Sequence, residues 1–241
     1  MINRILKKNR LVGIMVVLSL ALIFQCCSSN PHYMSVKTNK VPIMDGLIDE
    51  VWNSAKIDTL KGEMCGAEWD GPKDFSVFFR CLWDDKNIYF FFNVLDDKKI
   101  KNFNPIVPWF ENDVIELFFS PARKIKDENI SHFGFLYGVD SMLVVNNNRS
   151  SKDIKYKIID TNSGYNLELM IPWKEIAGIN PHEGISIPFN IEASDCDKTD
   201  TTKGIYYGRD ISISWSPKSC RRTWQQTINI GSLHLVGLKE N

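Results

Sequence analysis

Hydrophobic residues along this chain recur in short runs of strand length, separated by turn-forming residues. Residues 75–84 and 88–96 are rich in aromatic and β-branched side chains, and the turn at 84–87 between them predicts a hairpin. Residues 132–146 and 153–173 predict two further hairpins, because each holds Gly, Asn or Ser at its centre. Single strands are predicted over 113–120, 184–195 and 231–238.

Helical patterns are slight by comparison. Residues 48–55 and 172–176 each predict one short helix, and Pro172 suits the first turn of the second. Many short strands joined by tight turns predict an all-β fold, an antiparallel β-sandwich with one or two short helices. Hydrophobic residues make up 44% of the 241 residues, which is enough for one sizeable core.

One predicted strand carries an acid among hydrophobic neighbours. Both faces of the strand over 114–119 are largely apolar, so we expect this strand to be central in its sheet. Burying the carboxylate of Glu116 there costs free energy unless another group pairs with it. Glu116 is either a structural acid or an acceptor for a polar ligand. Trp109 and Phe110, just before the strand, favour the ligand, because a sugar ring stacks on an aromatic and donates its hydroxyls to an acid.

The N-terminus has the pattern of an export signal. A basic start is followed by an uncharged apolar run too short for a comfortable membrane span, and the run ends at Cys26. This is typical of a bacterial lipoprotein and predicts lipidation of Cys26, with Cys27, an ordinary signal peptide or an uncleaved anchor as alternatives. We expect residues 1–25 to be the signal peptide, 26–40 a polar tether and 41–241 the folded domain, lipid-anchored to the outer membrane on its periplasmic or outer side.

Charge and cysteine content bear on which partners, disulfides and metals are expected. The 29 basic and 29 acidic residues give a formal net charge of zero, so no nucleic-acid partner is expected. Four cysteines in the domain permit two disulfides in an exported protein, but buried thiols suit the sequence equally. They lack C-x-x-C spacing, so zinc is not suggested. These cysteines are Cys65, Cys81, Cys196 and Cys220.

Acidic residues in predicted turns are the candidate cation ligands. Asp96, Asp97, Asp195 and Asp197 offer carboxylate oxygens of the kind Ca²⁺ prefers, but they lack the spacing of an EF-hand. The sequence therefore favours solvated turn acids and no cofactor, with Ca²⁺ as the alternative. Asp113 is expected to bond the backbone at the start of its strand.

Several stretches in order resemble carbohydrate-binding module family nine and similar bacterial domains. They cover nearly all of residues 41–238: "IMDGLIDEVWNSA", "LWDDKNIYFFFNVLDD", "WFENDVIELFF", "YNLELMIPWKEI", "GISIPFNIEASDCD" and "ISWSP…TWQQTINIGSLHL". Each motif alone is weak, but six in the right order are specific. The resemblance implies a sandwich of the immunoglobulin-like or DOMON-like jelly-roll type that clamps a terminal sugar between two tryptophans.

The resemblance also implies roles for matching residues. One clamp partner falls on Trp109 or Phe110, the second on Trp224, and the hydrogen-bonding acid on Glu116. Asn112 stands where the motif has Asn or Gln.

This sequence departs from the sugar binders on the strand after the central one. That strand offers Gly134 and Leu136 in place of an Arg and an Asn, so Arg221, Arg222 or Gln225 would have to supply the lost donors. The remaining tryptophans are expected to pack in the core: Trp52, Trp83, Trp173 and Trp215.

An enzyme is not expected. A glycosidase needs two carboxylates facing one bond, and Glu111 and Glu116 would fall on opposite faces of a strand. The sequence predicts a non-catalytic, glycan-binding lipoprotein that supports polysaccharide use, with poly- or oligosaccharide and other polysaccharide-utilisation proteins as candidate partners. The alternatives are a structural module of an envelope assembly and a haem-binding domain of DOMON-like type. Haem ligands would come from Met142, Met170, His132 and His182.

Overall fold

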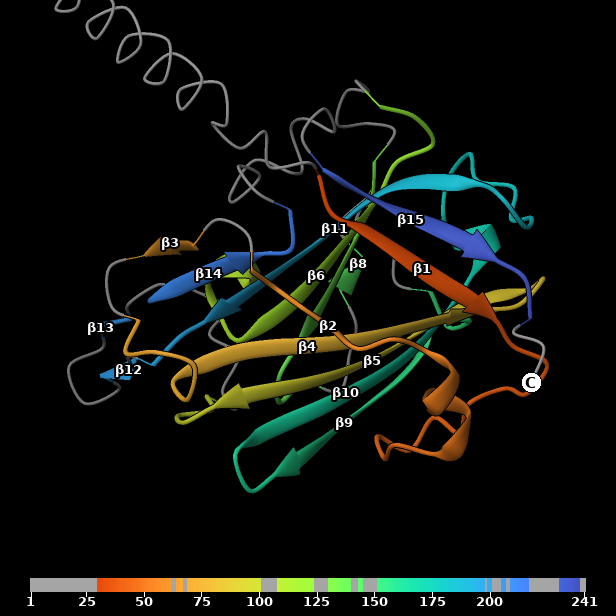
Figure 1. The fold of residues 1–241 in the computed structure, drawn as a ribbon. Helices are drawn as coiled ribbons and strands as arrows, with labels where there is room; N and C mark the ends of the chain where they lie inside the picture. The colour runs from red at the N-terminus through yellow and green to blue at the C-terminus, as the bar shows by residue number, and fades with distance from the viewer. Residues whose placement is uncertain are drawn as a thin grey trace, which may run out of the picture.

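The predicted strands form, and they build a sandwich from one curled sheet (Figure 1). The computed structural model describes residues 30–61, 64–66, 69–100, 108–123, 130–139, 143–144, 151–197, 199–200, 205–206, 209–216 and 230–238. The strands among them are β1 (His32–Lys37), β2 (Asp58–Thr59), β3 (Met64–Gly66), β4 (Phe75–Trp83), β5 (Asn87–Asp96), β6 (Val114–Phe119), β7 (Ser131–Leu136), β8 (Leu143–Val144), β9 (Lys155–Thr161), β10 (Gly164–Pro172), β11 (Ser186–Asp195), β12 (Thr199–Asp200), β13 (Ile205–Tyr206), β14 (Ile211–Ser214) and β15 (Gly231–Val236). The helical elements of the described residues are 3₁₀ turns: η1 (Glu50–Ser54), η2 (Trp109–Glu111) and η5 (Trp173–Glu175). No helix among these residues is long and apolar enough to cross a bilayer.

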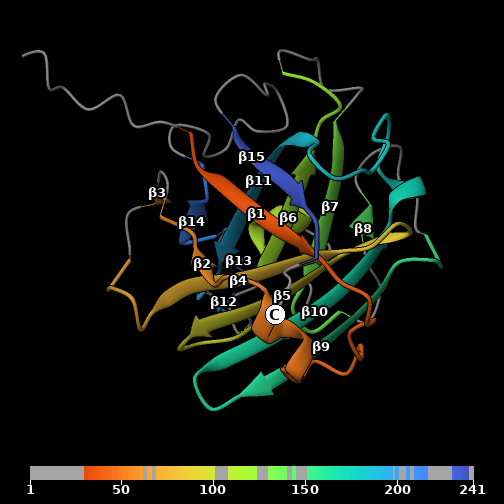
Figure 2. The ribbon, with the colours of Figure 1, turned by 45° about the vertical axis from the view of Figure 1, so that its right-hand side comes forward.

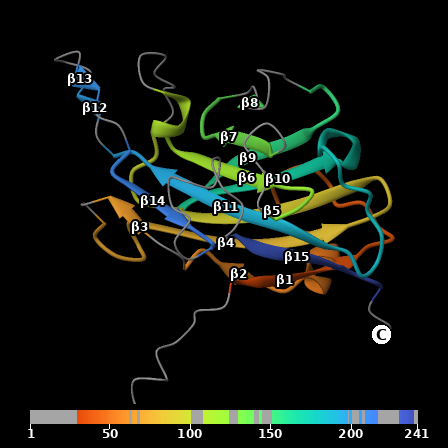
Figure 3. The same cartoon turned by 90° about the horizontal axis from the view of Figure 1, so that it is seen from above.

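The sheet curls so that its two halves face each other. The strand order is β8-β7-β6-β11-β15-β1-β4-β5-β10-β9, with β2, β3 and β14 paired off this path. Strands β4, β5, β10 and β9 form one layer, and β8, β7, β6, β11 and β14 form the other (Figure 2). Strands β15 and β1 connect the two layers, as the view from above shows (Figure 3). The predicted β-sandwich is therefore confirmed.

Strand β1 differs from the sequence prediction. Its residues, His32–Lys37, fall inside the segment expected to be a tether, yet β1 pairs in parallel with both β15 and β4. The polar composition of this segment concealed an alternation, since Tyr33 and Ser35 are buried while His32 and Met34 are exposed. The parallel pairing closes the sandwich between its first and last strands.

The main core fills the space between the layers, and aromatic rings dominate it. The Phe90 ring of β5 stacks on the Phe189 ring of β11 with centroids 5.5 Å apart, and Phe119 of β6 lies 4.9 Å from Phe189. Such pairs add about 0.5–1.5 kcal/mol each to the free energy gained by burial. As expected, four tryptophans are buried in core positions: Trp52, Trp83, Trp173 and Trp215.

A second, smaller core lies on the outer face of β5 and β10, under η1. Trp52 is fully buried there, and its indole N–H donates to Glu168 at 2.9 Å. Glu168 also accepts from the main-chain N–H groups of Asp45 (3.1 Å) and Gly46 (2.9 Å). This buried acid therefore has its hydrogen-bonding capacity met by donors.

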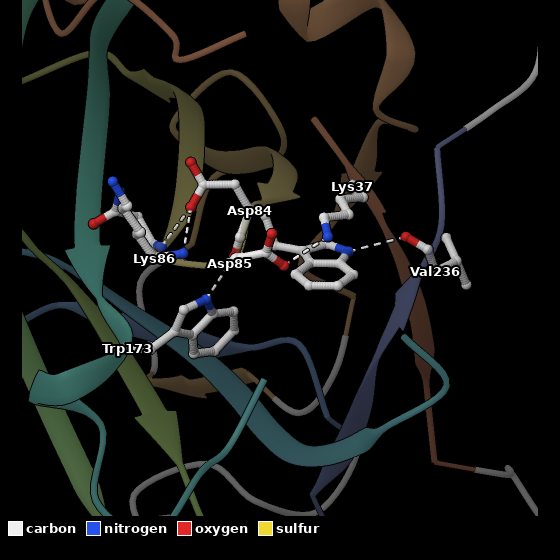
Figure 4. A network of polar contacts seen from close by, with 8 residues as sticks. Lys37, Asp84, Asp85, Lys86, Trp173 and Val236 are labelled. Carbon is white, nitrogen blue, oxygen red and sulfur yellow. Dashed lines mark hydrogen bonds and ion pairs between the residues drawn. The ribbon is translucent and has the colours of Figure 1, made fainter. Parts of the chain in front are cut away.

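The turn between β4 and β5 is held by the polar network in Figure 4. Asp84 accepts from the main-chain N–H of Lys86 at 2.7 Å, and its own carbonyl accepts from the indole of Trp173 at 2.8 Å. Trp83 donates to the carbonyl of Val236 at 3.0 Å. Two core tryptophans thus tie this hairpin turn to η5 and to the C-terminal strand.

The structure shows whether two of the four domain cysteines form a disulfide. Cys81 and Cys196 are buried thiols outside any disulfide. The side chain of Cys65, and Cys220 as a whole, lie outside the described residues, as does the predicted lipidation site Cys26.

Candidate functional site

One side of the second layer carries polar residues instead of core residues. On β6, β7, β11 and β14 every second residue points into the main core, for example Ile115, Leu117 and Ile191. The residues between them point the other way, and we call this side the polar face. Its buried polar members are Glu116, His132, Asn190, Glu192, Ser194, Ser212 and Ser214.

Glu116 lies at the centre of the polar face. In register it stands opposite Gly134 of β7 on one side and Glu192 of β11 on the other. Its Oε2 lies 2.7 Å from Nε2 of His132, and both side chains are buried. The His132 ring stacks on Phe118 with centroids 4.0 Å apart. The central acid predicted from the sequence is therefore paired with an imidazole held by a neighbouring ring.

Trp109 lies over the polar face beside this pair. Its indole centroid is 5.5 Å from the His132 ring, and it meets Phe110 edge-on at 5.6 Å. A Cβ on Gly134 would lie 2.3 Å from Cζ3 of Trp109. The missing side chain opposite Glu116 thus provides the space that the indole occupies. Trp109 and Phe110 are half-buried, at the boundary between the polar face and solvent.

The loop that carries these two aromatics is fixed from two directions. The side-chain amide of Asn112 donates to the carbonyl of Trp109 at 3.1 Å, so this amide serves the loop backbone and not the polar face. The main-chain N–H of Arg209 donates to Glu111 at 3.0 Å, and its guanidinium donates to Ser194 at 3.1 Å. The same guanidinium lies 5.4 Å from the centroid of the Phe110 ring.

Asp113 connects this loop to a group of buried acids. As predicted, its carboxylate bonds the backbone at the strand entrance, accepting from Ile100 at 2.7 Å and Cys196 at 2.8 Å. Asp96 and Asp195 are close by and, against the expectation of solvated turn acids, are only 3% and 2% exposed. Burial, reinforced by neighbouring carboxylates, raises the pKa of Asp195 to about 9, and burial raises the pKa of Asp96 to about 6.

The other predicted residues are not brought into the site by the described structure. Arg221, Trp224 and Gln225 lie outside the described residues. Of the haem candidates, His132 pairs with Glu116, whereas Met170 packs against the small core on the other layer. His182 bonds the carbonyl of Asn180 in an exposed loop, and Met142 lies outside the described residues.

Several residues of the polar face escaped sequence reasoning. Asn190, Glu192 and Ser194 alternate with core residues along β11, and Ser212 and Ser214 do the same on β14. This period of two, with every second residue small or polar in a buried strand, is the signal that marks a second face. The amide of Asn190 donates to Ser214 at 3.0 Å, so the face is joined across strands by hydrogen bonds.

The polar face holds carboxylate, amide and hydroxyl groups that are buried next to a flat indole, and the indole is half-buried. It is a candidate binding surface for a polyhydroxylated ligand, because hydroxyls need acceptors and donors while the C–H face of a sugar ring needs an aromatic. Residues 43–238 match the family described as "Carbohydrate family 9 binding domain-like". The chain belongs to this family.

Two curated relatives illustrate where such modules occur. The chain is 28% identical over 218 residues to "Exoglucanase XynX" of Acetivibrio thermocellus, a match that covers 87% of this chain and 18% of that protein. It is 28% identical over 204 residues to "Endo-1,4-beta-xylanase A" of Thermotoga neapolitana, covering 81% of this chain and 17% of that protein. The chain thus spans less than a fifth of these relatives, and it matches only the family 9 module.

Solved structures share the fold. A family 9 module from Caldicellulosiruptor kristjanssonii in complex with cellotriose aligns with a TM-score of 0.63 and 18% identity, covering 88% of this chain and 96% of that one. A putative carbohydrate-binding protein from Bacteroides uniformis aligns with a TM-score of 0.52 and 15% identity, covering 86% of this chain and 100% of that one.

Proposed function

We propose that this family 9 domain is a non-catalytic module that binds glycan at the polar face, beside Trp109 and Phe110. The observation that carries the proposal is the Glu116–His132 pair next to the indole of Trp109. A carboxylate held by an imidazole at 2.7 Å has its orientation set before ligand arrives, so the Glu116 side chain loses little further freedom when a sugar hydroxyl donates to it. The half-buried indole supplies the stacking surface.

β-1,4-Linked glucan or xylan is the ligand class that we favour. The curated relatives are named as an exoglucanase and a xylanase, and one structural relative holds cellotriose. The family motif, which clamps a terminal sugar, favours binding near a chain end. We propose Trp224, with Arg221 and Gln225 beside it, as the second wall of the site, on the strength of the family motif.

The proposed location is the cell envelope, with Cys26 lipidated and the domain exported. A binding module on a lipid anchor would hold glycan near the cell and support its breakdown by separate enzymes. Catalysis is assigned to those enzymes, since the family that residues 43–238 match is described as a binding domain.

Calorimetry with cellotriose and xylotriose tests the proposal on the full-length chain, kept soluble in a mild detergent. Trp109→Ala should weaken binding by roughly 1–3 kcal/mol, the scale of a lost aromatic anchor. Glu116→Gln should weaken it by roughly 1.5–3 kcal/mol for each charge-assisted hydrogen bond lost.

Two matched controls separate binding from folding. Phe78→Ala removes a half-buried ring from the outer face of β4, in the other layer, and should leave affinity unchanged. Glu168→Gln changes the buried acid beneath η1 and should affect stability but not affinity. If the parent binds neither trisaccharide nor insoluble cellulose or xylan, or if the Trp109 and Glu116 variants bind as the parent does, the proposal fails.

A further inference from the structure

Two histidines meet on the strands that connect the layers. His32 of β1 and His234 of β15 are 202 positions apart in the sequence, yet Nδ1 of His32 lies 3.2 Å from Nε2 of His234. The centroids of the two rings are 5.3 Å apart, and the ring planes are inclined by 52°. The rings meet because β1 and β15 pair in parallel and lie side by side (Figure 1). The fold thus places two imidazole nitrogens next to each other.

Both imidazoles lie on the outer side of the sheet. Their neighbours along the strands, Tyr33 and Leu233, are buried in the main core. Successive side chains of a strand point to opposite faces, so His32 and His234 point away from that core. His32 is exposed and His234 is half-buried, and an ion in solvent can therefore reach the pair.

The histidine pair is separate from the candidate glycan site. Strand β11 borders both: its residue Ser186 stands opposite His234, and its residue Glu192 stands opposite Glu116. The stretch of β11 between these two positions spans about 20 Å, at about 3.3 Å per residue. What the pair binds is therefore independent of the proposed glycan binding.

The separation of the two nitrogens fits a shared metal ion. Imidazole nitrogens bind a zinc-like ion at about 2.0–2.1 Å, so two of them are about 3.3 Å apart at a tetrahedral angle and about 2.9 Å apart at a right angle. The observed 3.2 Å lies between these values. The same distance permits a hydrogen bond between the rings, in which one of the two nitrogens holds a proton. An ion would instead take a lone pair from each.

The electrostatics around the pair favour neutral imidazole, which is the form that binds metal. Burial lowers the pKa of His234, and the neighbouring His32 and Arg123 lower it further. The guanidinium of Arg123 is held in place by the carbonyl of Ile230 at 2.8 Å and by the hydroxyl of Ser232. Its charge also opposes a bound cation, so we expect weaker binding than at a closed site with four protein ligands.

We propose that His32 and His234 form a binding site for Cu²⁺. Among the divalent first-row ions that imidazole binds, Cu²⁺ is held most tightly. Structural zinc takes four protein ligands, whereas two imidazoles leave the remaining positions to water and suit copper better. Met34 stands directly opposite His234 in the strand register and is 52% exposed, so it adds a thioether, a soft donor that copper favours, beside the pair.

A bound ion would strengthen the closure of the sandwich. Strand β1 pairs with β15 over five positions, from His32 to Val36, but its register with β4 covers only Val36 and Lys37. The pairing with β15 therefore holds most of β1 in the sheet. An ion that bridges His32 and His234 would oppose the detachment of β1, and because it binds the folded state it would raise the melting temperature.

The test combines calorimetry, electron paramagnetic resonance and thermal unfolding of the full-length chain with CuCl₂ at pH 7.5. Excess Mg²⁺ is present to occupy carboxylates, for which it competes without binding imidazole, and exposed thiols are alkylated so that they neither bind nor reduce copper. One equivalent of Cu²⁺ should bind with nitrogen couplings from two imidazoles. At about 100 times its Kd it should raise the melting temperature by about 5–10 °C, and Zn²⁺ at the same concentration by less.

Single variants assign the ligands. His32→Ala and His234→Ala should each weaken Cu²⁺ binding by about 100-fold or more, because one imidazole lacks the advantage of two linked ligands. His182→Ala is the matched control, an exposed histidine that bonds the carbonyl of Asn180, and it should bind Cu²⁺ as the parent does. The proposal is overturned if Cu²⁺ leaves the melting temperature unchanged, if its spectrum lacks the couplings to two imidazoles, or if the His32 and His234 variants bind it as tightly as the parent.

Discussion

The indole of Trp109 lies where a side chain at position 134 would stand, since a Cβ on Gly134 would be 2.3 Å from Cζ3 of the indole. Gly134 is directly opposite Glu116 in the register of β6 and β7. The sugar binders that the motif resembles carry an arginine on the strand that corresponds to β7. Gly134 cannot supply that charge, so Glu116 needs a different partner. In this chain the partner of Glu116 is His132, which lies two residues before Gly134 on the same strand and the same face.

Gly134→Ala should therefore displace Trp109. A Cβ at 2.3 Å from a ring carbon forces the indole or the strand to move, and overpacking of this kind costs about 1–3 kcal/mol. Chemical denaturation would measure the loss. In the double variant Gly134→Ala with Trp109→Ala the clash is gone, so the two effects should couple strongly, and additive effects would show that the two residues do not compete for space.

Displacing Trp109 should also weaken glycan binding. The Gly134→Ala variant should lose affinity for cellotriose by roughly the same 1–3 kcal/mol as Trp109→Ala, since both remove the stacking surface. Gly237→Ala is a control just after β15, where the atoms nearest to an added Cβ belong to the exposed carboxylate of Glu183. Glycan affinity that survives Gly134→Ala unchanged would place the stacking surface elsewhere.

Glu168→Gln should destabilise the domain. Its carboxylate accepts three hydrogen bonds, from Trp52 and from the main-chain N–H groups of Asp45 and Gly46. The side-chain amide of Gln can accept hydrogen bonds only at its oxygen, and its NH₂ group would face a buried N–H donor at the other position. Leaving that donor without an acceptor should lower the free energy of unfolding by about 1–3 kcal/mol. The free energy of unfolding measures the effect, with Glu183→Gln as an exposed control. Equal stability of the two variants would contradict the role of Glu168 beneath η1.

Cys26→Ala should block lipidation. The expected outcome is loss of the protein from the membrane fraction, or accumulation of an uncleaved precursor, because no thiol remains at the start of the mature chain. Fractionation with metabolic palmitate labelling checks this. Cys27→Ala is the neighbouring control and should remain lipidated; label that persists in the Cys26 variant and disappears in the Cys27 variant would move the site by one residue.

Local patterns in the sequence determined the elements and much of the core. The aromatic and β-branched runs set the β4–β5 and β9–β10 hairpins, and alternation on β6 placed Ile115, Leu117 and Phe119 in the core. These features follow from period-two burial and turn chemistry, which act between residues close in sequence. The position of Glu116 on a central strand and the role of Asp113 at its entrance followed from the same reasoning.

The partners of those residues were decided by the tertiary structure. His132 meets Glu116 because β7 pairs with β6 in one particular register. The same register places Gly134 opposite Glu116, and the indole of Trp109 fits there because Gly134 has no side chain. Asp96 and Asp195, which looked like solvated turn acids, are buried together because the curl of the sheet brings the ends of β5 and β11 into contact. Strand register and sheet curvature join residues as far apart in the sequence as Asp96 and Asp195, or His32 and Ser232, and no local pattern encodes such distances.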